Sequence, residues 1–355
     1  MNPPKPKGID FNENEIRTAL KENYPLMLML DFSQICNLNC KYCFSGADMH
    51  KRIDGELEYK NYVDIINQAK DMGIKTIFVP GAGEPSLDEN FWNVLPLVHK
   101  AGITLIVFTS GYTLTKENIK KLYENGATIG IKINSFKPEV QDWLAGIEGY
   151  TKKRDRTLNL LIKQGFNSAK PTRLWLDTLV CKQNFDEIVD LFVYSRENNI
   201  WPGINTMLHM GSGSEEKIMK QLDVPVKKIK ELWSKISTVD KEKYGYEWVP
   251  RPPYAAWDCN LYYFTMRIDN KGNVFKCLGA PIIGNILDKN KKVKKDILRY
   301  FWNSRSMNML TCVDKNIDQL IDGTYYGCPC RRNLKYGEKS MFQLKPEEDI
   351  WKSNI

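Results

Sequence analysis

The sequence predicts an α/β protein: a partial parallel barrel of six βα units, (β/α)6, followed by a smaller cysteine-rich domain. Three observations support this fold class. Short apolar runs alternate with amphipathic helical stretches over the first two-thirds of the chain, as in parallel βα units. Most of these runs are apolar throughout, as in a sheet covered on both faces. After residue 250 the alternation stops, and five of the nine cysteines follow.

Six candidate strands can be counted, fewer than the eight of a closed barrel, so an open or incomplete barrel is expected. The expected domains are an N-terminal extension (1–25), the barrel (26–213), a helical linker (214–250) and the cysteine-rich domain (251–355). The strand candidates are 26–32, 74–80, 103–108, 128–133, 173–180 and 203–208.

The segments between the strands carry helix signals. The stretch 59–73 repeats apolar residues at helical spacing and stops at a glycine. Asn184 is the expected N-cap of a later helix, with Glu187 three residues on. In the last part of the chain, 262–277 predicts a β-hairpin with its turn at 270–273.

Composition limits the class of protein. The hydrophobic share of 42% and charged share of 26% are those of a globular protein, and no apolar run approaches the roughly 18 residues of a membrane span. The basic, proline-rich N-terminus lacks the apolar segment of a secretory signal, so we expect a cytoplasmic protein and no membrane partner. In that reducing compartment, clustered cysteines favour metal or redox sites over disulfides.

The net charge of +8 suits an anionic partner, but it does not indicate nucleic-acid binding. The densest basic run, 288–296, has acidic ends and no interleaved aromatic residues. A solvated surface segment explains it, and we expect no nucleic-acid partner.

Cys36, Cys40 and Cys43 form a C-x3-C-x2-C pattern directly after the first strand, where a loop lies at the C-terminal mouth of a barrel. Structural zinc normally takes four protein ligands, whereas iron–sulfur clusters are held by closely spaced thiolates. Three thiolates leave one iron of a four-iron cluster without a protein ligand. That iron is open to a substrate or cofactor.

This pattern, with Tyr42 before the last cysteine, resembles the radical S-adenosylmethionine (radical SAM) superfamily. The segment "PGAGEP" after the second strand resembles the GGE-type motif of the family. There Gly83 would let the backbone approach closely, and Glu84 would accept hydrogen bonds from the methionine ammonium of the cofactor. A glycine turn with an exposed glutamate is the alternative for these residues.

Three later segments resemble the same family in order along the chain. In "TSGYTLT", Ser110 stands where the family's TNG-like loop has asparagine. The resemblance implies that Lys132 pairs with the methionine carboxylate, that Asn134 and Ser135 bind carboxylate or ribose, and that Leu179 lies near the adenine. A surface lysine, a helix N-cap and plain core residues are the alternatives. The implied cofactor contacts are Tyr42, Gly83, Glu84, Ser110, Lys132, Asn134, Ser135 and Leu179.

The resemblance implies a partial (β/α)6 TIM barrel that binds a [4Fe-4S] cluster and S-adenosylmethionine. One electron from the reduced cluster cleaves the cofactor to a 5′-deoxyadenosyl radical, which abstracts a substrate hydrogen. An external one-electron donor of the flavodoxin or ferredoxin type is the implied partner.

The C-terminal cysteines resemble those of the auxiliary-cluster domains called SPASM and, in a shorter form, twitch. Gly272 to Cys277 gives a G-x4-C ending, but Cys328 and Cys330 are spaced C-x-C. A full SPASM domain usually has seven cysteines for two clusters, and this region has five, which implies one auxiliary [4Fe-4S] cluster. A structural zinc site would satisfy the same coordination. The expected ligands are Cys259, Cys277, Cys328 and Cys330.

Two cysteines remain outside these sets. Cys181 ends a predicted buried strand and is expected to be a core residue. Cys312 is an alternative ligand in place of Cys328 or Cys330, or a thiol that returns a hydrogen atom to a substrate radical. In the second role, Cys312→Ala would stall an epimerase after hydrogen abstraction.

The expected function is oxidation (dehydrogenation or bond formation) or epimerisation of a small molecule such as a sugar or aminocyclitol. The alternative is a peptide-modifying maturase that forms a thioether, a crosslink or an epimer. Only about 25 residues precede the first strand, which favours the small molecule over a leader peptide.

Aromatic residues near the start of the second domain would stack on a sugar or else serve as core packing; they are Trp248, Tyr254 and Trp257. A non-enzymatic iron–sulfur or zinc scaffold would use the same cysteines without needing Glu84 or Lys132.

Overall fold

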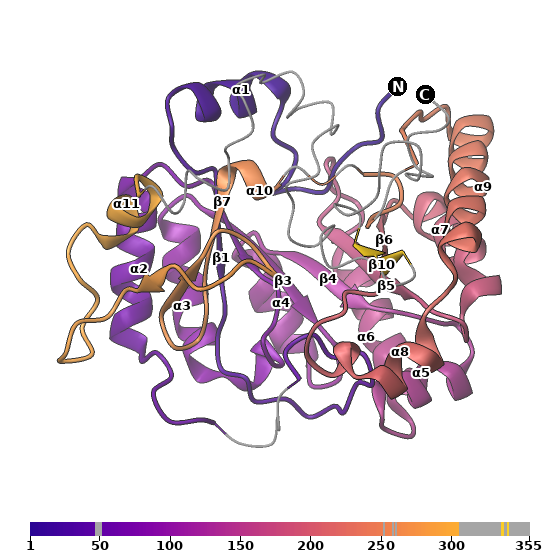
Figure 1. Cartoon of the computed structure of the whole chain (residues 1–355), viewed down its shortest axis with the longest axis horizontal. Coiled ribbons are helices and arrows are strands. Elements are labelled where there is room, and N and C mark those ends of the chain that lie inside the picture. The colour runs from indigo at the N-terminus through magenta and orange to yellow at the C-terminus, as the bar shows by residue number, and fades with distance from the viewer. Residues whose placement is uncertain are drawn as a thin grey trace.

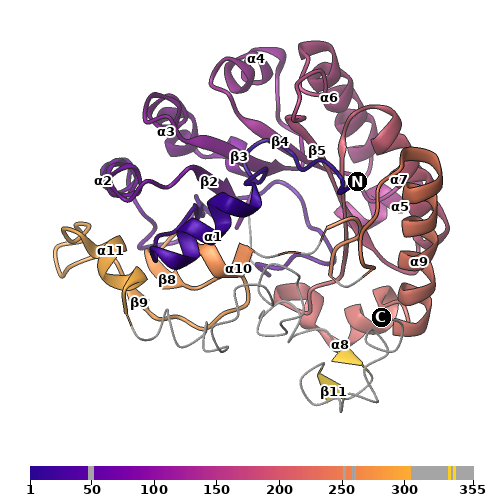
Figure 2. The same cartoon turned by 90° about the horizontal axis from the view of Figure 1, so that it is seen from above.

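The computed structural model describes residues 1–46, 52–250, 253–257, 259 and 261–304, together with the backbone of two short strands at 335–336 and 339–340. Within these ranges the chain forms one large sheet curved into an open barrel, with helices on its outer face (Figures 1 and 2).

Six parallel strands make the barrel, in the order β6-β5-β4-β3-β2-β1. The predicted partial barrel is therefore confirmed. Five strands lie where the sequence predicts them, and β6 begins and ends two residues earlier than expected. Pro202 is tolerated there because β6 is on the edge of the barrel, where a missing backbone N–H breaks no ladder. The strands are β1 (Met27–Leu30), β2 (Thr76–Val79), β3 (Thr104–Thr109), β4 (Thr128–Lys132), β5 (Leu174–Val180) and β6 (Trp201–Thr206).

Helices follow each strand and cover the outside of the sheet (Figure 2). They are α2 (Tyr59–Asp71), α3 (Glu89–Lys100), α4 (Lys116–Glu124), α5 (Pro138–Ala145), α6 (Tyr150–Gln164) and α7 (Ile188–Glu197). The polar stretch expected to be a helical linker forms α8 (Glu216–Leu222) and α9 (Val226–Tyr244). Short 3-10 turns are η1 (Pro85–Leu87), η2 (Phe185–Glu187) and η3 (Gly211–Ser214). No helix in the described part of the chain is both long and apolar enough to cross a membrane.

The predicted helix at 59–73 is confirmed as α2, which buries Tyr62 and Ile65 and stops before Gly73 at φ +75°. The predicted cap of the later helix is wrong in detail. Asn184 and Glu187 precede α7 across a 3-10 turn, and the Asn184 side chain makes no capping bond. It is fully buried and ties the ends of β4 and β5 together, donating to the carbonyls of Asn134 and Leu179, both at 2.7 Å.

Strand residues alternate between two apolar layers. Leu28 and Leu30 pack with the helices in the outer core, whereas Met27 and Met29 belong to a second cluster inside the barrel. That interior is strongly aromatic, and neighbouring rings meet edge to face. Its rings come from Phe78, Phe108, Trp175, Trp201 and Trp257.

The N-terminal extension closes the barrel at the N-terminal ends of the strands. The carbonyls of Lys7 and Gly8 accept hydrogen bonds from Thr128 and Thr76, and α1 (Glu13–Lys21) packs on the interior cluster through Ile16. In Figure 1 this cap lies opposite the loops that follow the C-terminal ends of the strands.

The predicted hairpin at 262–277 is confirmed as β7 (Thr265–Ile268) and β8 (Asn273–Phe275). Rather than standing apart, β7 pairs in parallel with β1 and extends the barrel sheet, and β9 (Gly284–Asn285) follows β8. Arg267 of β7 also pairs with the fully buried Asp31 at 2.5 Å. The predicted 251–355 domain is thus continuous with the barrel sheet over this part. The remaining elements are α10 (Leu261–Phe264), α11 (Ile297–Trp302), β10 (Lys335–Tyr336) and β11 (Lys339–Ser340).

Candidate functional site

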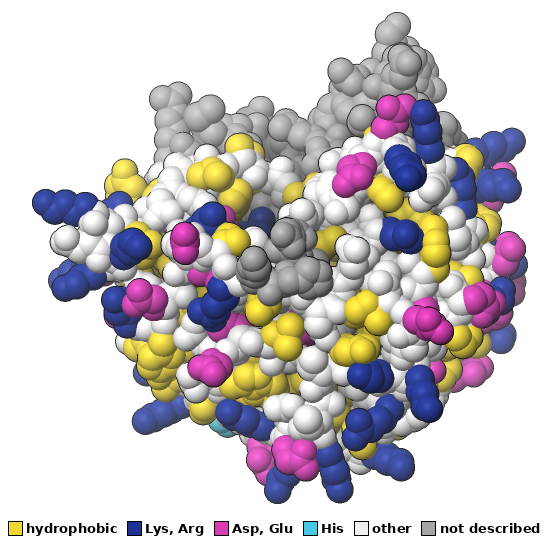
Figure 3. Space-filling view, turned by 90° about the horizontal axis from the view of Figure 1, so that it is seen from below, with side chains coloured by type: hydrophobic (Ala, Val, Ile, Leu, Met, Phe, Trp, Pro, Cys, Tyr) yellow, Lys and Arg dark blue, Asp and Glu magenta, His cyan; other side chains and the backbone are white. Residues whose placement is uncertain are grey.

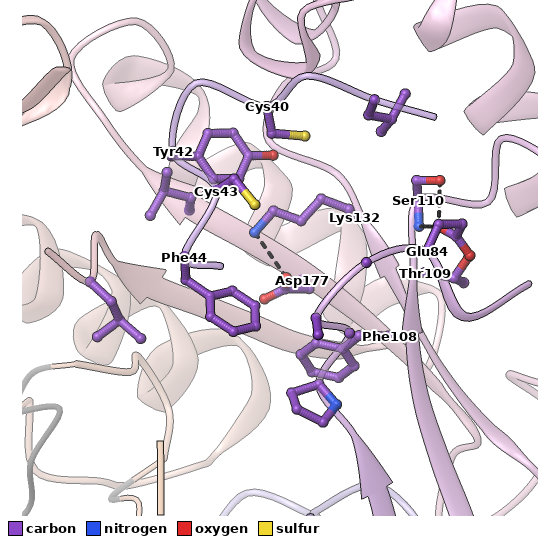
Figure 4. A pocket seen from close by; sticks show the side chains of 18 of the residues that line it. Cys40, Tyr42, Cys43, Phe44, Glu84, Phe108, Thr109, Ser110, Lys132 and Asp177 are labelled. Atoms are coloured by element: carbon purple, nitrogen blue, oxygen red, sulfur yellow. Dashed lines mark hydrogen bonds and ion pairs between the residues drawn. The ribbon is translucent and has the colours of Figure 1, made fainter. Parts of the chain in front are cut away.

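A cavity of about 210 Å³ opens at the C-terminal ends of the strands, the edge at which parallel α/β sheets bind their ligands. Cys36, Cys40 and Cys43 all line it, so the structure brings the three predicted ligands to one wall. Figure 4 shows Cys40 and Cys43 on their loop above the strand ends. Other predicted residues that line the cavity are Tyr42, Gly83, Glu84, Ser110, Lys132 and Leu179.

Backbone contacts hold the cysteine loop on two sides. The amides of Asn39 and Lys41 donate to the carbonyls of Ala145 and Leu144 at the end of α5, each at 3.1 Å. On the other side the amide of Glu84 donates to the carbonyl of Ile35 at 2.8 Å. Gly83 is required by this second contact, because a Cβ there would lie 2.4 Å from the Gln34 backbone.

Burial raises the pKa of the Cys36 thiol to about 11 and that of Cys40 to about 12. Without a cation, both groups would therefore stay protonated at neutral pH, and a bound metal would deprotonate them. Within the described ranges no three Cys, His, Asp or Glu side chains converge as a single metal ion would need. Three thiols spread along one cavity wall fit a cluster that takes one thiolate per iron.

The Glu84 carboxylate lies across the cavity from this loop and is 2% exposed. Thr109 and Ser86 donate hydroxyl hydrogen bonds to Oε1, at 2.6 and 2.7 Å. Ser110 donates its amide and its hydroxyl to Oε2, at 2.7 and 2.6 Å. The alternative of an exposed glutamate is therefore wrong: the ends of β2 and β3 orient this carboxylate at the cavity wall (Figure 4).

An ion pair crosses the cavity floor. Lys132 at the end of β4 lies 2.9 Å from Asp177 of β5, and Asn205 of β6 donates to the other carboxylate oxygen at 3.0 Å. Figure 4 shows the Lys132 side chain pointing toward Asp177. The alternative of a plain surface lysine is wrong, since only 21% of its side chain is exposed. Sequence analysis missed Asp177 and Asn205, whose only signal was a polar residue at an inward position of an apolar strand.

Asn134 and Ser135 are fully buried, and neither is among the residues that line the cavity in the described part of the chain. The Asn134 amide donates to the Tyr42 hydroxyl at 2.6 Å and accepts from the Leu179 amide at 2.9 Å. Ser135 donates to Glu187 at 2.7 Å. The structure thus places both behind the site, where Asn134 fixes Tyr42 against the strand ends.

Cys277 follows β8, is 5% exposed and belongs to the interior cluster, against which Cys259 also packs. Its neighbour Leu278 lines the same cavity as the cysteine loop, as does Tyr254. Cys312, Cys328 and Cys330 lie outside the described residues. Cys181 is fully buried beside Leu179, which confirms it as a core residue.

Comparison with known proteins agrees with this geometry. Residues 30–194 match the family model described as the radical SAM superfamily. The chain is 26% identical over 171 residues to the tungsten-containing aldehyde ferredoxin oxidoreductase cofactor-modifying protein of Pyrococcus furiosus, covering 47% of each chain. It is 27% identical over 165 residues to the mycofactocin maturase MftC of Mycolicibacterium smegmatis, covering 46% of this chain and 40% of the relative. The matched segment thus spans about half the length of these curated relatives, or less.

Solved structures share the fold over more of the chain. Streptococcus suis SuiB bound to its precursor peptide SuiA superposes with a TM-score of 0.62 at 17% identity, covering 84% of this chain and 70% of that one. The anSMEcpe structure with AdoMet and the Cp18Cys peptide gives 0.58 at 16% identity, covering 89% and 92%. The open barrel carries its three-cysteine loop at the strand ends, the edge where such folds bind their cofactors. Residues 30–194 of the chain belong to the radical SAM superfamily.

Proposed function

We propose that this protein is a radical SAM enzyme that modifies a peptide substrate. Cys36, Cys40 and Cys43 would hold a [4Fe-4S] cluster, and S-adenosylmethionine would occupy the cavity between that loop and Glu84. The observation that supports this most directly is the cavity itself, where three thiols, a fixed carboxylate and a lysine face one space. A scaffold or electron carrier would need neither the fixed carboxylate of Glu84 nor the ammonium group of Lys132.

When bound, the reduced cluster and S-adenosylmethionine supply a 5′-deoxyadenosyl radical that abstracts a substrate hydrogen. The chain's own residues bind and orient the cofactor. Glu84, held by Thr109 and Ser110, would accept from the methionine ammonium, and Lys132 would pair with the carboxylate. Leu179 and Tyr42 would cover the adenosine and limit the entry of water.

A peptide substrate has better support than the small molecule that the sequence favoured first. Two solved structures that share the fold contain peptides, a precursor peptide in SuiB and Cp18Cys in anSMEcpe. MftC, a curated relative, is a maturase. Since the fold likeness covers most of this chain, a peptide path over the same open barrel is the simplest proposal.

We further propose one auxiliary [4Fe-4S] cluster held by Cys259, Cys277, Cys328 and Cys330. Its support is the position of Cys277, whose neighbour Leu278 reaches the cofactor cavity. A cluster there would lie close enough to take an electron from a substrate radical, which fits an oxidation. Cys312 stays a candidate hydrogen donor for an epimerisation.

The activity can be tested without knowing the substrate. The protein is reconstituted anaerobically with iron and sulfide, reduced with dithionite and given S-adenosylmethionine. Formation of 5′-deoxyadenosine, lost in Cys36→Ala, Cys40→Ala and Cys43→Ala variants, would support the proposal. A fully iron-loaded wild-type protein that forms none would contradict it.

The substrate class needs a second measurement. Short peptides encoded beside the gene are added one at a time, with aminocyclitols and sugars as the competing class. A peptide that raises the rate of 5′-deoxyadenosine formation and loses hydrogen by mass spectrometry supports the proposal. Stimulation by an aminocyclitol or sugar alone would overturn the peptide assignment and leave the radical SAM activity standing.

A further inference from the structure

The cavity at the strand ends holds more acid than base. Of the described residues that line it, Glu84 and Asp177 carry a carboxylate, and Lys132 carries the one basic side chain. Glu84 is held by hydroxyl and amide donors of its own, whereas Asp177 pairs with Lys132 at 2.9 Å. A single ammonium group therefore faces two carboxylates before any ligand binds.

S-adenosylmethionine would give Lys132 a second partner. This inference rests on the proposed function, in which the methionine carboxylate pairs with Lys132 and the methionine ammonium with Glu84. The ammonium and carboxylate of the cofactor are then both neutralised, but Asp177 loses all or part of its ion pair. The sulfonium centre has no N–H or O–H group that could replace the lysine as a donor.

The protein around Asp177 offers little to replace that ion pair. In the described structure its other partner is the side-chain amide of Asn205, which is neutral and donates to Oδ1 at 3.0 Å. The Asp177 side chain is 14% exposed and lines the cavity, so a bound cofactor and substrate would exclude water from it. A carboxylate cut off from water is costly unless a cation or several donors replace the water. The filled cavity therefore needs a further cation beside Asp177.

The rest of the cavity suits a cation at the end of an aliphatic stem. Figure 4 shows Phe44 and Phe108 in the same cavity as Asp177. Long basic side chains bury their methylene groups against apolar surfaces, and aromatic faces attract the charge at the end. A lysine or arginine side chain combines these two properties. The apolar side chains of the lining include Phe44, Phe78, Phe108, Met207, Leu208 and Leu278.

The outer surface does not make the same selection. Figure 3 looks onto the end of the molecule at which the barrel strands end. Among the residues drawn in colour, acidic and basic side chains are both scattered over that face, and neither sign covers it alone. Discrimination between charged and uncharged substrates therefore depends on Asp177 inside the cavity.

We propose that the peptide substrate carries a lysine or arginine side chain that enters the cavity and binds Asp177. This side chain takes the place of Lys132 at Oδ2, while Lys132 binds the cofactor carboxylate. Asp177 is thus a specificity-determining residue, and Asn205 is a positioning residue that stays bonded to Oδ1. Because the substrate cation releases Lys132 for the cofactor, the two ligands should bind with positive cooperativity.

This linkage can be measured without turnover. Equilibrium dialysis gives the Kd of S-adenosylmethionine for the iron-loaded protein with Nα-acetyl-lysine methylamide, Nα-acetyl-arginine methylamide or the uncharged Nα-acetyl-norleucine methylamide present. At millimolar concentration either basic probe should lower that Kd about fivefold, and the norleucine probe should leave it unchanged. In Asp177→Asn the basic probes should have no effect. In the control Asp190→Asn, which changes an exposed carboxylate on α7, they should act as in the wild type.

Three results would overturn the proposal: an equal effect of the norleucine probe, no effect of the basic probes on the wild type, or an undiminished effect in Asp177→Asn. The comparison of probes on the wild type stands even if Asp177→Asn does not fold. If the loaded wild type binds no S-adenosylmethionine, the proposed function fails instead, so the two failures are distinguishable.

Peptides that stimulate 5′-deoxyadenosine formation give a second readout. Replacing their lysine or arginine residues one at a time by norleucine should raise KM about tenfold at one position, since a charge-assisted hydrogen bond is lost. Asp177→Asn should raise the KM of the parent peptide similarly and leave that of the norleucine peptide unchanged. Stimulation by an N-acetylated peptide without lysine or arginine would overturn the cation proposal and leave the peptide assignment standing.

Discussion

Ser110 donates both its amide and its hydroxyl to one oxygen of Glu84, at 2.7 and 2.6 Å. The pair joins the end of β3 to the loop after β2 and leaves the carboxylate with a single orientation at the cavity wall. The departure of "TSG" from the family's TNG-like loop is accommodated by this double contact.

Removal of the hydroxyl should weaken cofactor binding. In Ser110→Ala, Glu84 loses one of its charge-assisted bonds, which are worth about 1.5–3 kcal/mol each, so the Kd for S-adenosylmethionine should rise about tenfold or more. Glu84→Gln, which removes the charge, should raise it further. Equilibrium dialysis against labelled S-adenosylmethionine measures the change, with the exposed Ser234→Ala as the control. An unaltered Kd in Glu84→Gln would place the methionine ammonium elsewhere.

The sequence was sufficient for the elements whose residues repeat a local pattern. The six strands are apolar runs bounded by turn residues. The position of the cysteine loop, directly after the first strand, could be predicted from the spacing of the cysteines along the chain. What it could not show was which side chains would meet across the barrel. Asp177, Asn205 and Lys132 come from three strands, and only the shared register of β4, β5 and β6 brings them together.

The same limit explains Asn134. A polar residue after a strand suggests a ligand contact, but this amide is fully buried and bonded to Tyr42 and Leu179. Its environment includes Gln141 of α5 and Asn184, which lie 7 and 50 positions further along the chain, so no local pattern predicts it. The parallel pairing of β7 with β1 was missed for a similar reason, since β1 ends at Leu30 and β7 begins only at Thr265.

The pairing of Lys132 with the cofactor carboxylate can be separated from its pairing with Asp177. Lys132→Met keeps the length of the side chain but removes the ammonium, and should weaken S-adenosylmethionine binding about tenfold. Binding of decarboxylated S-adenosylmethionine, which lacks the partner group, should not change. Asp177→Asn keeps the ammonium and frees it from its present partner, so cofactor affinity should be retained or improved. Equal weakening toward both ligands in Lys132→Met would mean that the lysine supports the site without touching the carboxylate.

Iron content should report the two proposed clusters independently. The reconstituted wild type should hold about eight irons, and both the triple Cys36/Cys40/Cys43→Ala variant and Cys277→Ala should hold about four. Cys181→Ala, which removes a fully buried thiol of the core, should keep the full content and serves as the control. Metal analysis by mass spectrometry distinguishes the metals. About four irons and one zinc in the wild type would replace the auxiliary cluster by a structural zinc site.

The aromatic interior of the barrel makes a sharp prediction about Gly203. A Cβ at this position would lie 1.6 Å from Trp175 Nε1, and the Trp175 ring is held by edge contacts to Phe108 and Trp257 at 5.0 and 6.0 Å. Gly203→Ala must therefore shift the backbone or the ring, and should destabilise the fold by about 2–3 kcal/mol, measured by urea unfolding.

Within the described structure Trp175 Nε1 has no hydrogen-bond partner, so Trp175→Phe removes the clashing atom without breaking a hydrogen bond. The double variant should then be more stable than the sum of the two single changes predicts, by about 1 kcal/mol or more. Strict additivity would show that Trp175 is not what requires glycine at position 203.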